Sequence, residues 1–195
     1  MDERLEKQLN FILKLDQEKN VFRRTHITGG IRRENDAEHS WHMAVMAYLL
    51  REYSNVSLDI GKVILLCLIH DIVEIEAGDT YAYDAKGLKT QKEREKRAME
   101  SLFSILPPDQ QRELTDLFEE FEAFETPESK FAHAMDNLQP LLLNHSNGGQ
   151  DWKNHRVRKD QVYARQETTR AGSEVLFAYI DSILRENIKN GNILM

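Results

Sequence analysis

The chain has 195 residues, of which 41% are hydrophobic and 30% are charged, a composition typical of an ordinary globular protein. Its formal net charge of -7 excludes a general attraction to nucleic acid or anionic membranes, so an anionic ligand would need a local basic group. The single cysteine excludes an intrachain disulfide and a zinc site built on cysteines.

The beginning of the chain carries no pattern of a targeting signal. It reads Met-Asp-Glu-Arg-Leu-Glu, whereas an export signal has a basic stretch followed by an apolar one. No apolar run approaches the roughly 20 residues that a membrane span needs. We therefore expect a cytoplasmic protein that folds as a single domain over residues 1–195 and has neither a membrane nor a nucleic acid as partner.

The first predicted helix covers residues 3–19 and is followed by a loop. Apolar residues recur at helical spacing along this helix and predict one buried side. These residues are Leu5, Leu9, Ile12, Leu13 and Leu15. Residues 20–35 are predicted to be a loop, because they contain Gly29-Gly30 and four arginines.

Two further helices are predicted next, and the second of them is almost entirely apolar. Asp36 is a candidate N-cap for a helix over residues 37–53. Ser57 would cap a helix over residues 58–76, which Gly78 would end. Because a helix that is apolar all round is a core helix, we expect the second one to lie inside the protein.

The second half of the chain is predicted to be helical as well. Thr126 and Pro127 are typical of an N-cap followed by proline at the first helical position. The predicted segments are a loop over 78–89, helices over 90–106 and 109–124, a helix from 127 onward, a loop over 146–155 and a final helix over 159–190. Strand signals are nearly absent, so the predicted fold class is all-α.

The most informative residues are His70 and Asp71, a polar pair inside the apolar helix. Burying an imidazole and a carboxylate is costly unless something compensates, and a metal ion is the usual compensation. His39 and Asp136 offer two further ligands on other predicted helices. Such ligands suit a divalent ion such as Mn²⁺, Co²⁺, Fe²⁺, Zn²⁺ or Mg²⁺. The alternative is a hydrogen-bonded His-Asp pair without a metal ion.

This order of a His, a His-Asp pair and a distant Asp resembles the HD-domain phosphohydrolases, and among them the 5′-deoxynucleotidase group. The resemblance rests on residues 32–40, 70–74 and 136–140. It implies an HD-type helical bundle and one divalent metal ion, bound by His39, His70, Asp71 and Asp136. It also implies an enzyme that releases phosphate from nucleoside 5′-monophosphates, above all deoxynucleoside ones.

Two carboxylates are candidates for catalytic roles. Glu74 lies four residues after His70 and therefore projects on the same side of a helix. A carboxylate there could take or deliver a proton during hydrolysis, and the resemblance implies this general acid/base role. Asp79 follows the helix-ending Gly78 and could orient water or substrate.

Two basic residues are candidates for binding the phosphate of a small nucleotide. Arg24 precedes the Gly-Gly loop, and a guanidinium matches the oxygens of a phosphate in pairs. Arg23 is an alternative, because a shift of one residue is possible. Lys153 could also reach a phosphate.

Several alternatives stay open at this point. His42 or His133 could extend the site to a second metal ion. The reaction could also be that of a phosphodiesterase or pyrophosphohydrolase on a signalling nucleotide, or the chain could be a non-catalytic module that senses nucleotides. Similar proteins are often dimers, so we expect a homodimer.

Overall fold

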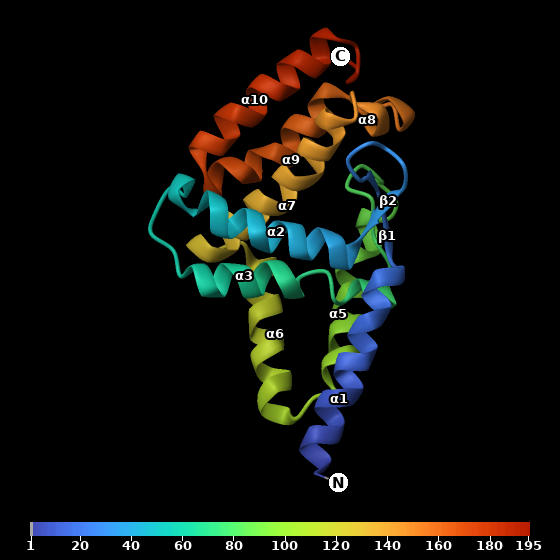
Figure 1. Cartoon of the computed structure of the whole chain (residues 1–195), viewed down its shortest axis with the longest axis vertical. Coiled ribbons are helices and arrows are strands. Elements are labelled where there is room, and N and C mark those ends of the chain that lie inside the picture. The colour runs from blue at the N-terminus through green and yellow to red at the C-terminus, as the bar shows by residue number, and fades with distance from the viewer. Residues whose placement is uncertain (1) are drawn as a thin grey trace.

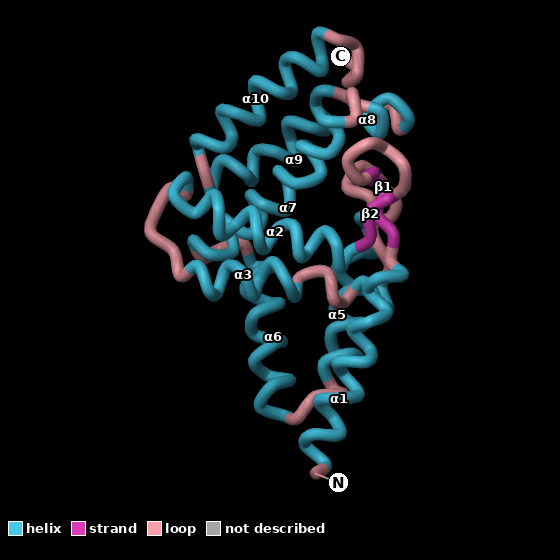
Figure 2. Tube along the Cα trace, in the orientation of Figure 1, coloured by secondary structure: helices cyan, strands magenta, loops and turns pink. Residues whose placement is uncertain are grey.

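Helices make up most of the computed structural model, which describes residues 2–195 (Figures 1 and 2). The helices are α1 (Glu3–Leu15), α2 (Asp36–Leu50), α3 (Ile60–Ile69), α4 (Glu74–Ala77), α5 (Leu88–Phe103), α6 (Pro108–Ala123), α7 (Pro127–Ser146), α8 (Gln150–Asn154), α9 (Lys159–Gly172) and α10 (Glu174–Lys189). The strands β1 (Phe22–His26) and β2 (Arg33–Asn35) pair antiparallel, and 3₁₀ turns cover Asp16–Asn20 and Arg51–Tyr53. The predicted all-α fold is confirmed. Across residues 2–195, every helix is too short or too polar to span a membrane.

Helix α7 lies at the centre of the fold and packs against α2, α3, α6, α9 and α10. Its residues Phe131, Met135 and Leu138 are buried, and so are Met43 of α2 and Ile180 of α10. In Figure 1, α9 and α10 lie above α2 and α3, whereas α1, α5 and α6 extend below them. Because α7 is surrounded in this way, a polar side chain on it is held firmly by its neighbours.

A second apolar cluster joins α1, α5 and α6. Phe103 packs edge-to-face against Phe11 and Phe118, with ring-centroid distances of 6.2 and 6.5 Å. The predicted buried stripe on the first helix is wrong, because Phe11 is the residue of α1 that is buried. Four residues expected in that stripe are exposed by 45 to 72%, namely Leu5, Leu9, Ile12 and Leu13, whereas Leu15 is partly buried against this cluster. The helix projects toward the lower tip of the molecule, where few neighbours cover it (Figure 1).

The apolar helix predicted over residues 58–76 is divided at the His-Asp pair. Helix α3 ends at Ile69, and His70 is its C-cap. Tight turns with bonds between residues three apart follow, and α4 begins at Glu74. The prediction that His70 and Asp71 lie in the middle of a helix is therefore wrong. Consecutive side chains project in other directions in a turn than in a helix. His70 and Asp71 can therefore each contact a different partner.

The helix ends use other caps than the sequence predicts. Asn35 caps α2 in place of Asp36, and it forms a capping box in which side chain and backbone bond reciprocally. Asp59 caps α3 in place of Ser57, by accepting a bond from a backbone amide one turn later. Gly78 ends α4 as predicted, with a φ of 75° that glycine adopts easily.

Two predicted loops contain regular structure. Residues 20–35 form the hairpin of β1 and β2, and the loop expected after α7 contains α8. The Asn147 side chain accepts a hydrogen bond from the backbone N–H of Gly29 at 2.9 Å. Asp151 of α8 accepts bonds from the backbone N–H and the ring of His26 at 2.9 and 2.7 Å. These long-range bonds hold the hairpin against the helical body.

The final helix predicted over residues 159–190 is two helices, α9 and α10. Ser173 between them is extended, and its hydroxyl accepts the backbone N–H of Leu176 at 3.0 Å and so caps α10. Gly172 lies against α7 so closely that a Cβ would be 2.4 Å from the carbonyl oxygen of Lys130. The break lets both helices fold back along α7.

Candidate active site and metal centre

The fold brings the predicted metal ligands together. His39 comes from α2, His70 from the end of α3 and Asp136 from α7. His39 Nε2 is 3.2 Å from Asp136 Oδ1, and one ligand atom from each of these three residues lies within 4.8 Å of the other two. Asp71 lies beside them, with its Oδ1 3.1 Å from His70 Nε2. Segments far apart in the sequence thus place two imidazoles and the Asp136 carboxylate at one point, with the Asp71 carboxylate adjacent to His70.

Hydrogen bonds orient both imidazole rings. His39 Nδ1 is 3.0 Å from Oε1 of Gln139, and His70 Nδ1 is 3.0 Å from the carbonyl oxygen of Cys67. Each oxygen accepts a hydrogen bond from the Nδ1–H group, so the lone pair of a neutral ring is on Nε2. Gln139 in turn donates to Glu34 Oε1 at 2.5 Å. Metal-binding histidines are commonly oriented by such outer hydrogen bonds.

The surroundings of His70 Nε2 indicate whether these residues fit a metal ion. The atom is buried and has no hydrogen-bond partner in the part of the chain that the structure describes. The nearby Asp71 oxygen is not aligned with it for a hydrogen bond. A buried polar atom left without a partner is costly, and a metal ion would satisfy it. Because imidazole and carboxylate groups suit divalent ions, the donor set fits one.

The two histidines have different pKa values in the metal-free protein. Burial and the Arg23 guanidinium together lower the pKa of His39 to about 4. Burial also acts to lower the pKa of His70, but the Asp71 and Asp136 carboxylates together outweigh burial and raise that pKa to about 9. At neutral pH His39 is therefore uncharged, whereas His70 carries a proton that a metal ion would have to displace.

A second group of buried carboxylates surrounds Arg23. Asp36, Asp71 and Glu74 each have an oxygen within 4.8 Å of the others. Arg23 Nη1 donates to Asp71 Oδ2 at 2.6 Å and to Asp36 Oδ1 at 3.2 Å. Its side chain is only 12% exposed. Arg23 is the alternative to Arg24 as the phosphate-binding candidate. Its positive charge thus offsets the negative charges of the carboxylates next to the proposed metal site.

Glu74 and Asp79 lie on the wall of one cavity. Glu74 is buried, and burial together with the charges of Asp71 and Asp36 raises its pKa well above the usual range. Burial also raises the pKa of Asp79, although Arg23 opposes this. In the metal-free protein Glu74 therefore keeps its proton to a higher pH than an ordinary glutamate, which suits a general acid.

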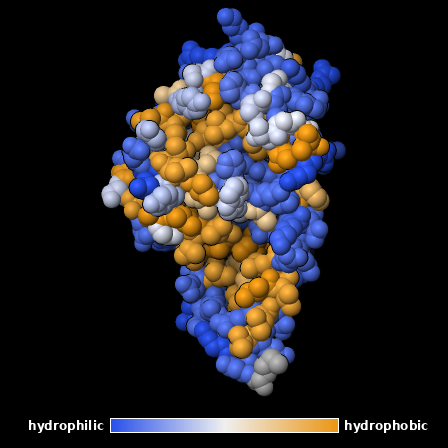
Figure 3. Space-filling model, viewed as in Figure 1, coloured by the Kyte–Doolittle hydropathy of each residue, from blue (hydrophilic) through white to orange (hydrophobic). Residues whose placement is uncertain are grey.

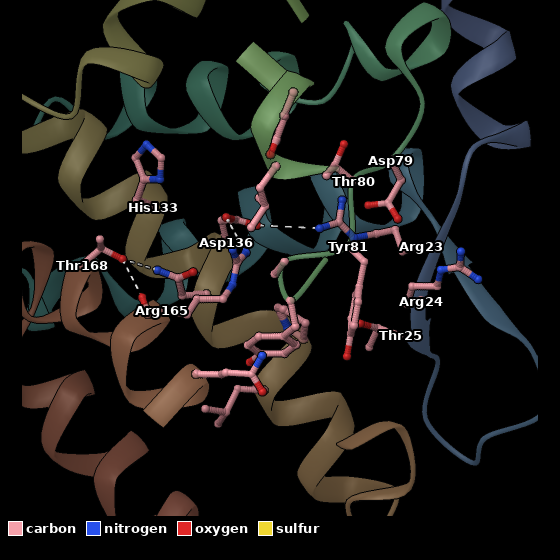
Figure 4. Close-up of a pocket in the computed structure, with 18 of the residues that line it drawn as sticks. Arg23, Arg24, Thr25, Asp79, Thr80, Tyr81, His133, Asp136, Arg165 and Thr168 are labelled. Carbon is pink, nitrogen blue, oxygen red and sulfur yellow. Dashed lines mark hydrogen bonds and ion pairs between the residues drawn. The ribbon is translucent and has the colours of Figure 1, made fainter. Parts of the chain in front are cut away.

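The cavity over these residues has a volume of about 580 Å³ (Figure 4). Side chains of β1, of the segment after α4, of α7 and of α9 line it. In Figure 4, Asp79 of the segment after α4 lies beside Arg23 of β1, and Tyr81 of the same segment extends toward Thr25. Ligand sites of small molecules are typically roughly 300–1,000 Å³, so the cavity can take a molecule of that class.

The basic candidate residues occupy different positions relative to the cavity. Arg24 lines the cavity with an exposed side chain, whereas Lys153 is exposed on α8 and lies outside the cavity lining. Arg165 of α9, which the sequence does not single out, lines the cavity, and its Nη2 is 3.1 Å from Asp136 Oδ2. No sequence signal distinguishes Arg165 from the exposed Arg170 on the same helix. The contact depends on how α9 packs against α7.

His42 and His133, the alternatives for a second metal ion, have other contacts. His42 Nδ1 is 3.1 Å from Nε2 of Gln139. His133 Nε2 is 2.9 Å from the carbonyl oxygen of Phe121, and its ring stacks on the Phe121 ring at 4.0 Å. Within residues 2–195, neither belongs to a group of side chains close enough to hold an ion. These contacts favour a single ion.

Comparison with known sequences identifies relatives. The family described as HD domain matches residues 15–176. The Bos taurus protein named 5′-deoxynucleotidase HDDC2 is 31% identical over 135 residues. The matched region is 69% of this chain and 64% of the bovine protein, so the chain spans somewhat less than two thirds of that relative.

Solved structures share the fold. The crystal structure of a predicted metal-dependent phosphohydrolase from Magnetospirillum magnetotacticum MS-1 is 44% identical, with a TM-score of 0.95 over 100% of this chain and 97% of that chain. The PH0347 protein from Pyrococcus horikoshii OT3 is 20% identical, with a TM-score of 0.65 over 91% of this chain and 98% of that chain, which shows a likeness of fold alone. Since the family match covers most of the sequence, the chain belongs to the HD-domain family, as its motifs predict.

Proposed function

We propose that this chain is a metal-dependent phosphohydrolase that releases phosphate from deoxynucleoside 5′-monophosphates. The observation that carries the proposal is the buried pair of His39 and His70, each with a ring nitrogen within 4.8 Å of an Asp136 oxygen, beside a ligand-sized cavity that His70 and Asp136 line. The names of the bovine and Magnetospirillum relatives support the same class of reaction. Because the chain aligns with only part of the bovine protein, the nucleotide substrate belongs to the proposal.

In this proposal one divalent ion is held by His39, His70, Asp71 and Asp136. Such an ion, when bound, neutralises charge on a phosphoryl group and makes water more acidic. The bond from His39 to Gln139 and the bond from His70 to the backbone keep both rings in position to receive it. The mixed nitrogen and oxygen ligands favour a first-row transition ion over Mg²⁺.

The protein residues around the ion are proposed to bind the phosphate and move a proton. Hydrolysis places the oxygen of water on phosphorus and breaks the bond from phosphorus to the nucleoside 5′-oxygen, which then needs a proton. Glu74 is buried beside Asp71 and is proposed to deliver that proton. Arg23 is proposed to bind the phosphate, and Asp79, which lies beside Arg23 on the cavity wall, to orient water or substrate. Arg24, at the exposed side, is proposed to attract the anionic substrate.

A phosphate-release screen tests the proposed function. The protein is stripped with a chelator, reloaded separately with Mn²⁺, Co²⁺, Zn²⁺ or Mg²⁺, and offered nucleotides of several classes. We expect metal-dependent release of inorganic phosphate from nucleoside 5′-monophosphates, with deoxynucleotides turned over faster than ribonucleotides. Cyclic nucleotides and nucleoside triphosphates serve as the comparison substrates.

Three other results of the screen would each indicate one of the alternative functions. Cleavage confined to cyclic nucleotides would identify a phosphodiesterase, and release of pyrophosphate a pyrophosphohydrolase. Tight nucleotide binding without turnover under any metal would identify a sensing module. Each of these results would overturn the proposed monophosphatase.

We also propose that two copies of the chain associate through an apolar face on α2 and α3. This face consists of Trp41, Val45, Tyr48 and Leu49 of α2 with Leu65 and Leu68 of α3, which are exposed by 39 to 64%. Figure 3 shows apolar side chains gathered on this side of the molecule, over α2 and α3 and continuing toward α1. The six side chains expose roughly 600 Å², the upper end for a monomer, while one side of a standard interface is roughly 800 Å².

Sedimentation equilibrium tests this association. We expect the wild-type protein to have twice the mass of the chain, and Leu49→Asp or Leu65→Asp to give a monomer with unchanged circular dichroism, because a charge would be buried in the interface. Val175→Asp, at a position of α10 that is 58% exposed, should remain a dimer. A wild-type protein that stays monomeric at high concentration would contradict the proposal.

A further inference from the structure

Arg165 is the basic residue that approaches the proposed metal site from α9. Its Nη2 is 3.1 Å from Asp136 Oδ2, while the other oxygen of Asp136 is 3.2 Å from His39 Nε2. The side chain is 30% exposed and lines the cavity. Figure 4 shows its guanidinium on one side of Asp136 and that of Arg23 on another. One guanidinium from strand β1 and one from helix α9 therefore converge on one metal-ligand candidate.

Polar contacts between α7 and α9 hold the backbone of Arg165 in this position. The Thr168 hydroxyl donates to the carbonyl oxygen of Arg165 at 2.9 Å, and Asn137 donates to the Thr168 hydroxyl at 2.6 Å. Gln166 donates to the carbonyl oxygen of Asn137 at 3.1 Å. Asn137 directly follows Asp136 in α7, so these bonds fix Arg165 next to that carboxylate. The placement is built into the helix pair.

The two guanidinium groups have different capacity for a further ligand. Arg23 already donates to Asp36 and Asp71 and is only 12% exposed. Arg165 contacts one carboxylate, Asp136, and is open to the cavity. A guanidinium has five N–H donors, so Arg165 has donors left for an anion in the cavity.

We propose that Arg165 binds a terminal oxygen of the substrate phosphate and makes the site selective for phosphate monoesters over diesters. The proposal rests on the proposed function. A monoester carries three terminal oxygens and close to two negative charges at neutral pH, whereas a diester has two such oxygens and one charge. A metal ion, Arg23 and Arg165 offer three positive partners, which match the monoester. The paired geometry of a guanidinium also suits phosphate better than a lysine does.

The test combines phosphate binding with a comparison of substrates. Arg165→Gln and Arg165→Lys are prepared with Arg170→Gln as the matched control, because Arg170 lies on α9 and pairs with the exposed Glu167 at 2.9 Å. Calorimetry of inorganic phosphate with the metal-loaded proteins measures binding without turnover. We expect Arg165→Gln to weaken phosphate binding by about tenfold to a hundredfold, the worth of a charged hydrogen bond. Arg165→Lys should recover part of this, and Arg170→Gln should match the wild type.

Turnover supplies the second readout. For Arg165→Gln we expect kcat/KM to fall more for a nucleoside monophosphate than for bis(p-nitrophenyl) phosphate, with unchanged metal content. Unchanged phosphate binding in Arg165→Gln would overturn the proposal, because Arg165 would then not bind the phosphate. Loss of the metal ion from Arg165→Gln would also overturn it, because Arg165 would then only support Asp136. If the wild type hydrolyses no monophosphate but Arg165→Gln still weakens phosphate binding, the proposed function fails and the phosphate site stands.

Discussion

Replacing His70 with alanine is expected to remove the bound metal ion and reduce phosphate release to the background rate. His70 Nε2 is buried without a hydrogen-bond partner among residues 2–195, so a metal ion is the partner that it would lose. Asp136→Ala should act in the same way, because Asp136 faces His39 at 3.2 Å. Elemental analysis should find about one ion per wild-type chain and almost none in either variant.

Thermal unfolding separates loss of the ion from loss of the fold. Added metal should raise the melting temperature of the wild type, because a ligand that binds only the folded state stabilises it. It should leave His70→Ala unchanged. His155→Gln is the control, since His155 bonds the backbone of α8 away from the proposed ligands. Full metal content in His70→Ala and Asp136→Ala would contradict the ligand assignment.

The affinity for the metal ion should also depend on pH. The pKa of His70 is about 9 in the metal-free protein, so below that pH the ion must displace a proton. The affinity for the metal ion should therefore rise with pH by about tenfold per pH unit and level off near pH 9. His39, with a pKa of about 4, should add nothing above pH 5. Calorimetry in buffers of different ionisation enthalpy measures the released proton, and an affinity that does not change from pH 6 to 8 would contradict this linkage.

The second large effect is expected for Glu74→Gln. The substitution keeps the shape of the side chain but removes the proton transfer, so turnover should fall by roughly 10²–10⁴-fold, the usual contribution of a positioned general acid or base. Glu74 is not among the four proposed metal ligands, so metal content should be unchanged. The phosphate-release rate and the metal content are measured on the same sample.

Glu76→Gln is the matched control on the same short helix. Glu76 pairs with Lys14 at 3.2 Å and is partly exposed, so its substitution should leave turnover unchanged. A metal-replete Glu74→Gln enzyme with full activity would remove Glu74 from the mechanism. Asp79, which lines the same cavity, would then be the next candidate for the proton transfer.

Local patterns predict most helices well, and their ends less well. Thr126 and Pro127 mark the start of α7 correctly, because the cap and the first turn are local interactions. The break of α3 at Ile69 has no comparable signal. The break at Ser173 has a local one, because Ser173 caps α10, and packing adds to it, since Gly172 lies against the backbone of α7. The exposed apolar residues of α1 show the same limit, because helical spacing identifies a stripe but not what covers it.

The proposed metal ligands are the part of the site that the sequence by itself determined. His39, the pair of His70 and Asp71, and Asp136 could be named because a buried polar pair needs a partner wherever the fold places it. Only the tertiary structure decided which basic side chains surround them. Arg23 rather than Arg24 reaches the carboxylates, Lys153 lies outside the cavity lining, and Arg165 approaches Asp136. A surface arginine and a site arginine are identical in sequence, and the packing of α9 against α7 alone distinguishes them.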